Sequence, residues 1–256
     1  MNITFLGTDA CMTAADNDSS GMLIDRKYLV DTGYFLVGSL KRLGIEPQQI
    51  ERLFFTHMHH DHYMALPQLL FWYLQTGKPL EALHIYGPKR DLRRVVGLSM
   101  AFLQAGSGQP FYCDCGFPTL HELEAGDSAE FDEMKLETSA SYHPVDGLCY
   151  RFEEKGRVLS ITGDTFYCSR IPAALHDCDL LVHETALAAQ DADINNPPTC
   201  LHSNIDIALR TAREARAKRL FVVHFNQSKA GAVIDKAARL DALEVIYPER
   251  FVTYEV

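Results

Sequence analysis

The chain has 256 residues, of which 47% are hydrophobic and 23% are charged. These proportions are ordinary for a folded globular protein, and they exclude a disordered chain, a coiled coil and a collagen-like repeat. Asp and Glu number 34 against 24 Lys and Arg, which leaves a net charge of −10. Because an acidic surface repels phosphate backbones, this charge disfavours binding of nucleic acid over an extended surface.

Membrane and secretory signals are missing from the sequence. No apolar run approaches the roughly 18 residues of a membrane span, and residues 1–7 lack the basic start and apolar stretch of a secretory signal. The 7 Cys are an odd number without the close spacing of a disulfide scaffold, which favours reduced thiols. We therefore expect a cytoplasmic protein that makes no membrane contact.

The first half of the chain has the periodicity of short strands followed by helices. Alternating apolar positions predict strands over 2–7, 21–26, 28–31, 52–56 and 83–86. Helical spacing predicts helices over 34–43, with Thr32 as N-cap, over 62–75, and again after residue 86. Residues 106–118 have the composition of a loop.

The second half repeats this progression. Strands are expected over 134–141, 149–153, 158–162, 180–183, 220–224 and 244–247, and helices over 205–217 and 230–240. So many strands need cover on both faces, which predicts two sheets packed face to face with helices outside. No linker rich in Pro, Gly or Ser divides the halves, so we expect a single domain over 1–256.

A histidine cluster directly follows the strand expected at 52–56. His57 and His59 are two residues apart, so in extended backbone they project to one side, while Asp61 and His62 follow at once. Neutral imidazole and carboxylate are zinc ligands, with manganese or iron also allowed. The segment therefore predicts two adjacent divalent cations in preference to a solvated, histidine-rich loop.

Three further candidate ligands lie at the ends of later strands. They are His143, Asp164 after Gly163, and His224 after the apolar run 220–223. Taken singly, they fit a turn histidine, a helix-capping aspartate and a core histidine. Loops that leave one edge of a sheet converge on one place, so together they are expected to join the histidine cluster.

The order of these motifs resembles the metallo-β-lactamase superfamily of binuclear metallohydrolases, and within it the ribonuclease Z branch. The motifs are His-x-His-x-Asp-His, a lone His, Gly-Asp-Thr and a late His. Further counterparts are residues 5–8, 29–33, 66–67, 183–185 and 202–203. The resemblance spans essentially the whole chain and implies an α+β fold, a four-layer αββα sandwich.

The resemblance also implies a ligand set. One ion would be held by His57, His59 and His143, the other by Asp61, His62 and His224, with Asp164 bridging both. His60 is not a ligand in the family, so it is expected to be incidental or a donor to a ligand. Two such cations lower the pKa of a bridging water, and the hypothesis is that this hydroxide attacks a phosphodiester while Asp61 orients it.

His202 is the candidate proton donor for the leaving alkoxide. It precedes Ser203, which is expected to cap the helix that follows, and a helix N-terminus favours a phosphate. Glu184 would hold the imidazole, as the similar pair does in ribonuclease Z. The alternatives are a surface role for His202 and a salt bridge for Glu184.

The spacing of the motifs bears on the substrate. Ribonuclease Z proteins usually carry a long arm, which grips transfer RNA, between the third His and the Gly-Asp-Thr box. Here His143 and Asp164 are only 21 positions apart. We therefore expect a metal-dependent phosphodiesterase acting on small or cyclic phosphodiesters. The alternatives are a ribonuclease Z-type tRNA 3′ endonuclease and a lactone or carboxyl-ester hydrolase on the same centre; retention of all seven ligands disfavours an inactive scaffold.

Other features carry weaker expectations. The basic stretches 89–94 and 210–219 are expected to be solvated helix faces, although they alone could support contact with RNA. Cys113 and Cys115 are expected to be ordinary loop thiols. The aromatic run 71–73 is expected to lie mainly in the core, although part of it could wall the pocket or form a dimer contact, since many relatives in the family are dimers.

Overall fold

The structure is a computed structural model that describes residues 1–104 and 116–256. The first of its two seven-stranded sheets runs in the order β14 (Thr253–Glu255), β1 (Asn2–Gly7), β2 (Gly21–Ile24), β3 (Tyr28–Val30), β4 (Arg52–Phe54), β5 (His84–Pro88) and β6 (Thr119–Leu123). The second runs in the order β13 (Glu244–Ile246), β12 (Arg219–Val223), β11 (Leu180–Glu184), β10 (Arg157–Ile161), β9 (Leu148–Glu154), β8 (Met134–Ala140) and β7 (Ser128–Phe131).

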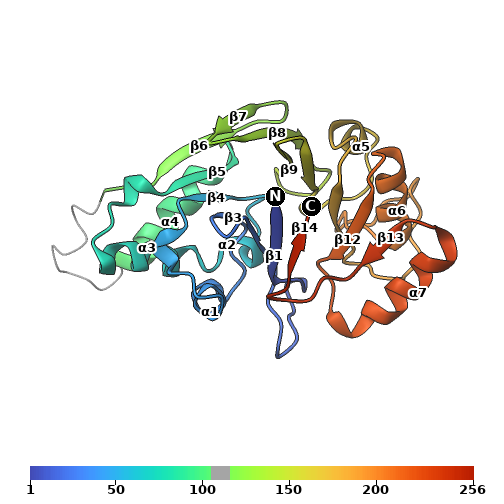
Figure 1. Ribbon diagram of the computed structural model, residues 1–256, viewed down its shortest axis with the longest axis horizontal. Coiled ribbons are helices and arrows are strands. Elements are labelled where there is room, and N and C mark those ends of the chain that lie inside the picture. The colour runs from blue at the N-terminus through green and yellow to red at the C-terminus, as the bar shows by residue number, and fades with distance from the viewer. Residues whose placement is uncertain (105–115) are drawn as a thin grey trace.

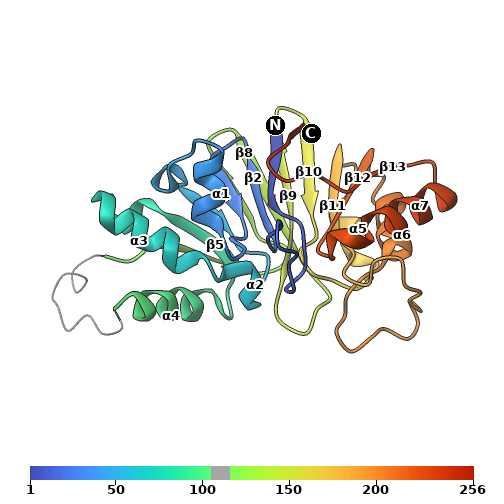
Figure 2. The same cartoon turned by 90° about the horizontal axis from the view of Figure 1, so that it is seen from below.

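Helices cover the outer face of each sheet (Figures 1 and 2). On the first sheet lie α1 (Leu36–Arg42), α3 (Leu66–Thr76) and α4 (Leu92–Gln104), with the short α2 (His60–Tyr63) at the edge. On the second lie α5 (Arg170–Ala174), α6 (Ile205–Glu214) and α7 (Ala230–Leu240). Short 3-10 turns occur at η1 (Pro47–Gln49), η2 (Leu80–Ala82) and η4 (Gln227–Lys229). The expected four-layer αββα sandwich is confirmed.

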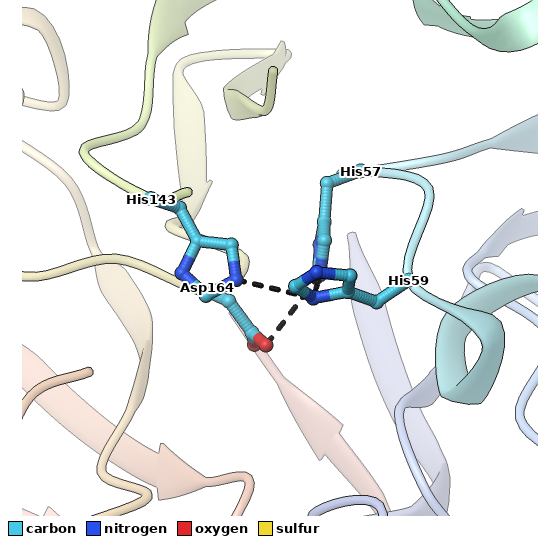
Figure 3. Close-up of side chains that lie close together, drawn as sticks. All are labelled: His57, His59, His143 and Asp164. Atoms are coloured by element: carbon cyan, nitrogen blue, oxygen red, sulfur yellow. Dashed lines mark hydrogen bonds and ion pairs between the residues drawn. The ribbon is translucent and has the colours of Figure 1, made fainter. Parts of the chain in front are cut away.

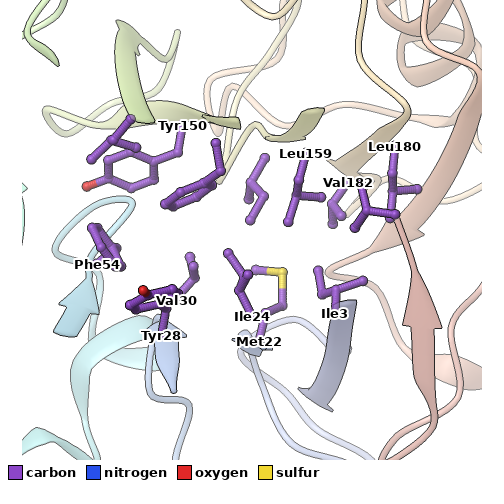
Figure 4. Packing of buried hydrophobic residues seen from close by; sticks show 14 of the residues in the cluster. Ile3, Met22, Ile24, Tyr28, Val30, Phe54, Tyr150, Leu159, Leu180 and Val182 are labelled. Atoms are coloured by element: carbon purple, nitrogen blue, oxygen red, sulfur yellow. The ribbon is translucent and has the colours of Figure 1, made fainter. Parts of the chain in front are cut away.

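Each central strand contributes to two hydrophobic cores. In β2, Met22 and Ile24 belong to the core between the sheets, whereas Leu23 packs under the helices of the first sheet. In β11, Val182 faces the core between the sheets and Leu181 faces the helices of the second sheet. Because successive side chains of a strand alternate between its faces, strands covered on both sides become apolar throughout. Figure 4 shows the two inner faces meeting.

The direction of the strands explains where the polar motifs gather. β3 and β4 are parallel, as are β10, β11 and β12. β1 is related to β3, and β8 to β10, by two antiparallel pairings, so these strands run the same way. Loops that leave the carboxyl ends of such strands share one edge of their sheet, which is where ligand sites form in α/β proteins. The residues that follow these strands are Thr8, Asp31, His57, His143, Asp164, Thr185 and His224.

The helix expected over 62–75 is two helices. α2 ends at Tyr63 and α3 begins at Leu66, with Pro67 in its first turn. Proline has no backbone N–H, and its ring clashes with the carbonyl four residues earlier, so it starts a helix better than it continues one.

The prediction that Thr32 caps the helix at 34–43 was wrong. Helix α1 begins at Leu36 without a side-chain cap of its own. The carboxylate of Asp18 accepts hydrogen bonds from the backbone N–H groups of Tyr34 and Phe35 instead, at 2.9 Å each. Thr32 donates its hydroxyl to the carbonyl of His62. Asp18 thus fixes the two residues that precede α1, and no side chain caps the helix itself.

The strands and α-helix without a counterpart in the sequence-based prediction are β6, β7, β14 and α5, and the 3-10 turns η1, η2 and η4 were not predicted either. They are three to five residues long, and polar side chains interrupt their apolar pattern. Cys113 and Cys115 lie outside the described residues. None of the described helices has both the length and the apolar character that crossing a membrane requires.

Replacing Phe54 with Ala should lower the free energy of unfolding by about 3–5 kcal/mol. Phe54 is fully buried, and its ring lies 4.7 Å from that of Tyr86 and 5.3 Å from that of Phe152. The control is Phe102→Ala, since Phe102 is 72% exposed on α4. Urea denaturation measures both variants, and equal losses would contradict the assignment of Phe54 to the central core.

Candidate metal centre

Four side chains from both halves of the chain meet in a first ligand group. His57, His59, His143 and Asp164 each offer an atom within 4.8 Å of the others (Figure 3). His59 Nδ1 lies 3.0 Å from His57 Nε2 and 3.2 Å from His143 Nε2, and Asp164 Oδ2 lies 3.5 Å from His57 Nε2. Three imidazole nitrogens and one carboxylate oxygen therefore surround one point.

A second ligand group lies beside the first. Asp61, His62 and His224 also meet within 4.8 Å, and His224 Nε2 lies 3.3 Å from Asp61 Oδ2. The carboxylate of Asp164 touches this group too, at 3.5 Å from His62 Nε2 and 3.4 Å from His224 Nδ1. The structure thus brings all seven expected ligands together, with Asp164 between the two groups.

Two buried imidazole nitrogens that make no hydrogen bond with the described residues show that this arrangement fits a divalent cation. His62 Nε2 and His224 Nδ1 are buried and take part in no hydrogen bond with the described residues. A buried polar atom without a partner is costly, but an imidazole lone pair directed at a cluster of carboxylates and imidazoles suits a metal ion. The other nitrogen of His62, Nδ1, lies 2.8 Å from Asp31 Oδ2, an arrangement typical of metal-binding histidines.

Burial sets the protonation states of the first group. It lowers the pKa of His57 and His59, and it lowers the pKa of His143 to about 4. Burial alone would raise the pKa of Asp164, but the charges of neighbouring histidines outweigh it and hold this pKa well below the usual range. Neutral imidazoles and an ionised carboxylate are the forms that bind metal.

A metal ion would have to compete with protons for the second group. Burial acts to lower the pKa of His62, but the charges of Asp164 and Asp31 outweigh it and raise this pKa. Burial acts to raise the pKa of Asp61, but a hydrogen bond from His224 and the charge of His62 keep it below its usual range. A cation placed here therefore displaces a proton from His62.

Asp31 contacts the candidate metal centre, although the sequence analysis did not single it out. Its buried carboxylate accepts hydrogen bonds from the backbone N–H and the hydroxyl of Thr56, both at 2.9 Å, while facing His62. This contact fixes the ring orientation of His62. An Asp-Thr-Gly sequence directly after a buried strand was the signal that could have revealed it.

The pair of Glu184 and His202 lies beside both ligand groups. Glu184 Oε1 is 3.0 Å from His202 Nδ1, and the ring of His202 lies 4.9 Å from that of His143 and 5.5 Å from that of His224. Burial acts to lower the pKa of His202, but the hydrogen bond and charge of Glu184 outweigh it and raise the pKa to about 9. The imidazole is therefore protonated at neutral pH.

Glu184 also organises the surrounding loops. The same oxygen accepts the backbone N–H groups of Thr165 and Ser203 at 3.0 and 3.1 Å, and Oε2 accepts that of Ala186 at 2.8 Å. This buried carboxylate thus joins the loop after Asp164 to the segment that carries His202.

The prediction that Ser203 caps α6 was wrong. Asn204 is the cap, and its side-chain oxygen accepts the N–H of Ile207 at 2.9 Å. Ser203 is fully buried, and its hydroxyl donates to the carbonyl of Thr165 at 2.6 Å. It thereby adds a second link between the loop after Asp164 and α6.

Several other sequence features lie outside the centre. His60 is exposed, and its Nε2 lies 3.2 Å from the hydroxyl of Tyr34. In the run 71–73, Tyr73 is buried in the core while Phe71 is 40% exposed. The basic side chains at 89–94 are exposed and form ion pairs, as expected of a solvated surface.

The family comparison matches most of the chain. A family model described as "Anti-Pycsar protein Apyc1" matches residues 1–243. The chain belongs to this family. Among curated proteins, ribonuclease Z of Bacillus velezensis is 27% identical over 289 aligned positions, which cover 90% of this chain and 90% of that protein.

Solved structures show the same fold. The metallo-β-lactamase fold protein YhfI from Bacillus subtilis superposes with a TM-score of 0.81 at 20% identity, covering 99% of this chain and 98% of that one. The short form of human tRNase Z superposes with a TM-score of 0.76 at 25% identity, covering 100% and 99%. The chain is thus a metal-dependent hydrolase of the metallo-β-lactamase superfamily, similar to ribonuclease Z.

Zinc added to the metal-free protein should raise its stability, because a ligand that binds the folded state shifts the unfolding equilibrium. At free zinc 100 times the Kd of one site, the gain is about 2.7 kcal/mol, or a rise of about 5–10 °C in Tm. Asp164→Ala should remove most of this rise, since Asp164 contacts both ligand groups.

The matched control is Asp191→Ala, which alters a fully exposed carboxylate. Thermal unfolding with and without zinc measures each protein. Equal zinc-dependent rises in the two variants would contradict a metal site at Asp164.

Proposed function

We propose that this chain is a phosphodiesterase that acts on small or cyclic phosphodiesters with two divalent metal ions, zinc in preference to manganese or iron. The observation that carries the proposal is the position of His202, whose ring lies next to ligands of both groups and is held by buried Glu184. When bound, a pair of divalent cations supplies charge stabilisation for phosphoryl oxygens and a water of lowered pKa.

The proposed roles of the side chains follow from their positions. The first group is His57, His59 and His143, the second is Asp61, His62 and His224, and Asp164 is shared by both. Asp61 would also orient the attacking water. His202 has Nδ1 occupied by Glu184, which leaves Nε2 to give its proton to the leaving oxygen.

A cavity next to the ligands supports a small substrate. It has a volume of about 440 Å³ and is lined by His143, by apolar side chains such as Val145 and Leu148, and by the charged residues Lys89, Arg90, Glu124 and Asp146. Ligand cavities for small molecules have volumes of about 300–1,000 Å³. In this proposal, one substituent of the phosphodiester occupies this cavity beside His143 of the first ligand group.

The short interval between His143 and Asp164 further supports a small substrate. Strands β9 and β10 occupy most of it. The alignment with ribonuclease Z of B. velezensis spans 289 positions, more than the 256 residues of this chain, so that relative has inserted residues that this chain lacks.

Cleavage of precursor tRNA is the second candidate. It is favoured by the names of the relatives, ribonuclease Z and tRNase Z, and by exposed Lys89 and Arg90 at the rim of the cavity. Lactone hydrolysis has less support, because curated relatives are named ribonuclease Z, an activity on phosphodiesters. A homodimer and a cytoplasmic location stay predictions.

A substrate panel tests the proposal. The zinc-loaded protein should hydrolyse bis(p-nitrophenyl) phosphate and a cyclic mononucleotide, and it should cleave neither a lactone nor a precursor tRNA at comparable kcat/KM. A higher kcat/KM on precursor tRNA would identify the protein as a tRNA endonuclease instead. A higher kcat/KM on the lactone would contradict the proposal that it is a phosphodiesterase.

Replacing His202 with Ala should slow the hydrolysis of alkyl phosphodiesters by about 10²–10⁴-fold, because general acid catalysis contributes about that much. The effect should be smaller on p-nitrophenyl esters, since p-nitrophenolate leaves without protonation. Zinc content, measured by elemental analysis, should not change.

The matched control is His60→Ala, which removes an exposed neighbouring imidazole outside both ligand groups. Loss of zinc from the His202 variant, or an equal slowing with both kinds of leaving group, would refute the role of a proton donor.

A further inference from the structure

Residues 8–20 connect β1 to β2 and run along the second ligand group. We propose that this segment is a scaffold dedicated to the site of Asp61, His62 and His224, and that buried Asp9 is its central positioning residue. The inference rests on the proposed function insofar as that function needs two ions. It goes further by assigning different supports to the two sites.

The segment holds His224 in an uncommon backbone conformation. His224 has φ +65°, in the left-handed region that side chains other than Gly rarely adopt. Its backbone N–H donates to the carbonyl of Thr8 at 2.7 Å, and the N–H of Gln227 donates to Asp9 Oδ1 at 2.9 Å. A strained conformation persists only where surrounding contacts hold it in place. These two hydrogen bonds hold the backbone on both sides of the turn.

Asp9 links this turn to the fold of the segment. Its carboxylate is fully buried, and Oδ2 accepts the backbone N–H of Ala14 at 2.7 Å. Oδ1 also accepts the amide of Asn17 at 2.9 Å, and the same amide donates to the hydroxyl of Thr8 at 2.9 Å. Removing this carboxylate would leave the backbone N–H groups of Ala14 and Gln227 without their acceptor, so Asp9 determines where Thr8 presents its carbonyl.

The far end of the segment supports the other two ligands. Ser19 is fully buried and donates its hydroxyl to the backbone carbonyl of Asp61 at 2.7 Å. Ser20 donates to Asp31 Oδ2 at 3.2 Å, and this oxygen faces His62 Nδ1 at 2.8 Å. Each member of the second group is therefore fixed, directly or through one side chain, by residues 8–20.

The first group has different supports. His57 Nδ1 lies 3.2 Å from the hydroxyl of Thr56, and His143 Nδ1 lies 3.4 Å from the carbonyl of Leu201. Within the described residues, no hydrogen bond connects residues 8–20 to His57, His59 or His143. A disturbance of the segment should therefore act on one metal site and spare the other.

Two variants and one matched control test this selectivity. Asp9→Asn removes one carboxylate oxygen from the segment, and Ser19→Ala removes a single hydroxyl. The control, Asp16→Asn, makes the same change at an exposed carboxylate in the same segment. Each protein is freed of metal by chelation and titrated with Zn²⁺ in a calorimeter, and thermal unfolding of the metal-free form checks that it is folded.

Wild type and Asp16→Asn should bind two equivalents of zinc. In Asp9→Asn and Ser19→Ala the affinity of one equivalent should fall about 10–100-fold, the usual effect of losing a supporting contact. The affinity for the other equivalent of zinc should change by less than about twofold.

Double variants identify the affected site. In a His224→Ala background, where the second site is already damaged, Asp9→Asn should leave the remaining zinc affinity unchanged. In a His59→Ala background, where the first site is damaged, the same change should weaken the remaining affinity about 10–100-fold.

Equal weakening of both equivalents, no weakening in a folded variant, or an effect in the His224→Ala background would overturn the inference. If Asp9→Asn fails to fold, the zinc titration of Ser19→Ala tests the inference in its place. Wild type binding fewer than two equivalents would instead overturn the metal count of the proposed function, so the two failures are distinguishable.

Discussion

The carboxylate of Asp164 is the interaction on which the arrangement of the site depends. It is buried and lies 3.4–3.5 Å from nitrogens of His57, His62 and His224, so it contacts both ligand groups. A buried anion is tolerated only among compensating partners. These partners come from loops of both sheets. The two sheets must therefore be correctly placed relative to each other for the negative charge of Asp164 to be compensated.

The fold meets this requirement through strand direction. Every ligand-bearing loop leaves the carboxyl end of a strand, and the core between the sheets keeps those ends together (Figures 2 and 4). The supporting contacts of Asp31, Glu184 and residues 8–20 then fix individual rings. Packing thus sets the position of the site, and hydrogen bonds set its detailed geometry.

Much of this arrangement could be predicted from the sequence because its signals are local. The His-x-His-x-Asp-His motif and the polar residues after apolar runs identify strand ends, and strand ends in such folds share an edge. The split between α2 and α3 was missed because the helical periodicity continues across Pro67. The contact of Asp18 with the residues before α1, and the contact of Thr8 with His224, depend on long-range geometry that no local pattern encodes.

The hydrogen bonds of Glu184 have a consequence for the loop that precedes His202. Ala186 at one end of that loop, and His202 and Ser203 at the other, all bond to this single carboxylate. Both ends of the stretch 187–201 are therefore held close together at the carboxylate of Glu184. Because the entropy of closing a loop grows only slowly with its length, insertions or deletions in the solvent-facing residues 191–199 should lower the free energy of unfolding only slightly. New recognition sequences could be grafted there without disturbing buried Ala188 or the Leu201 carbonyl beside His143.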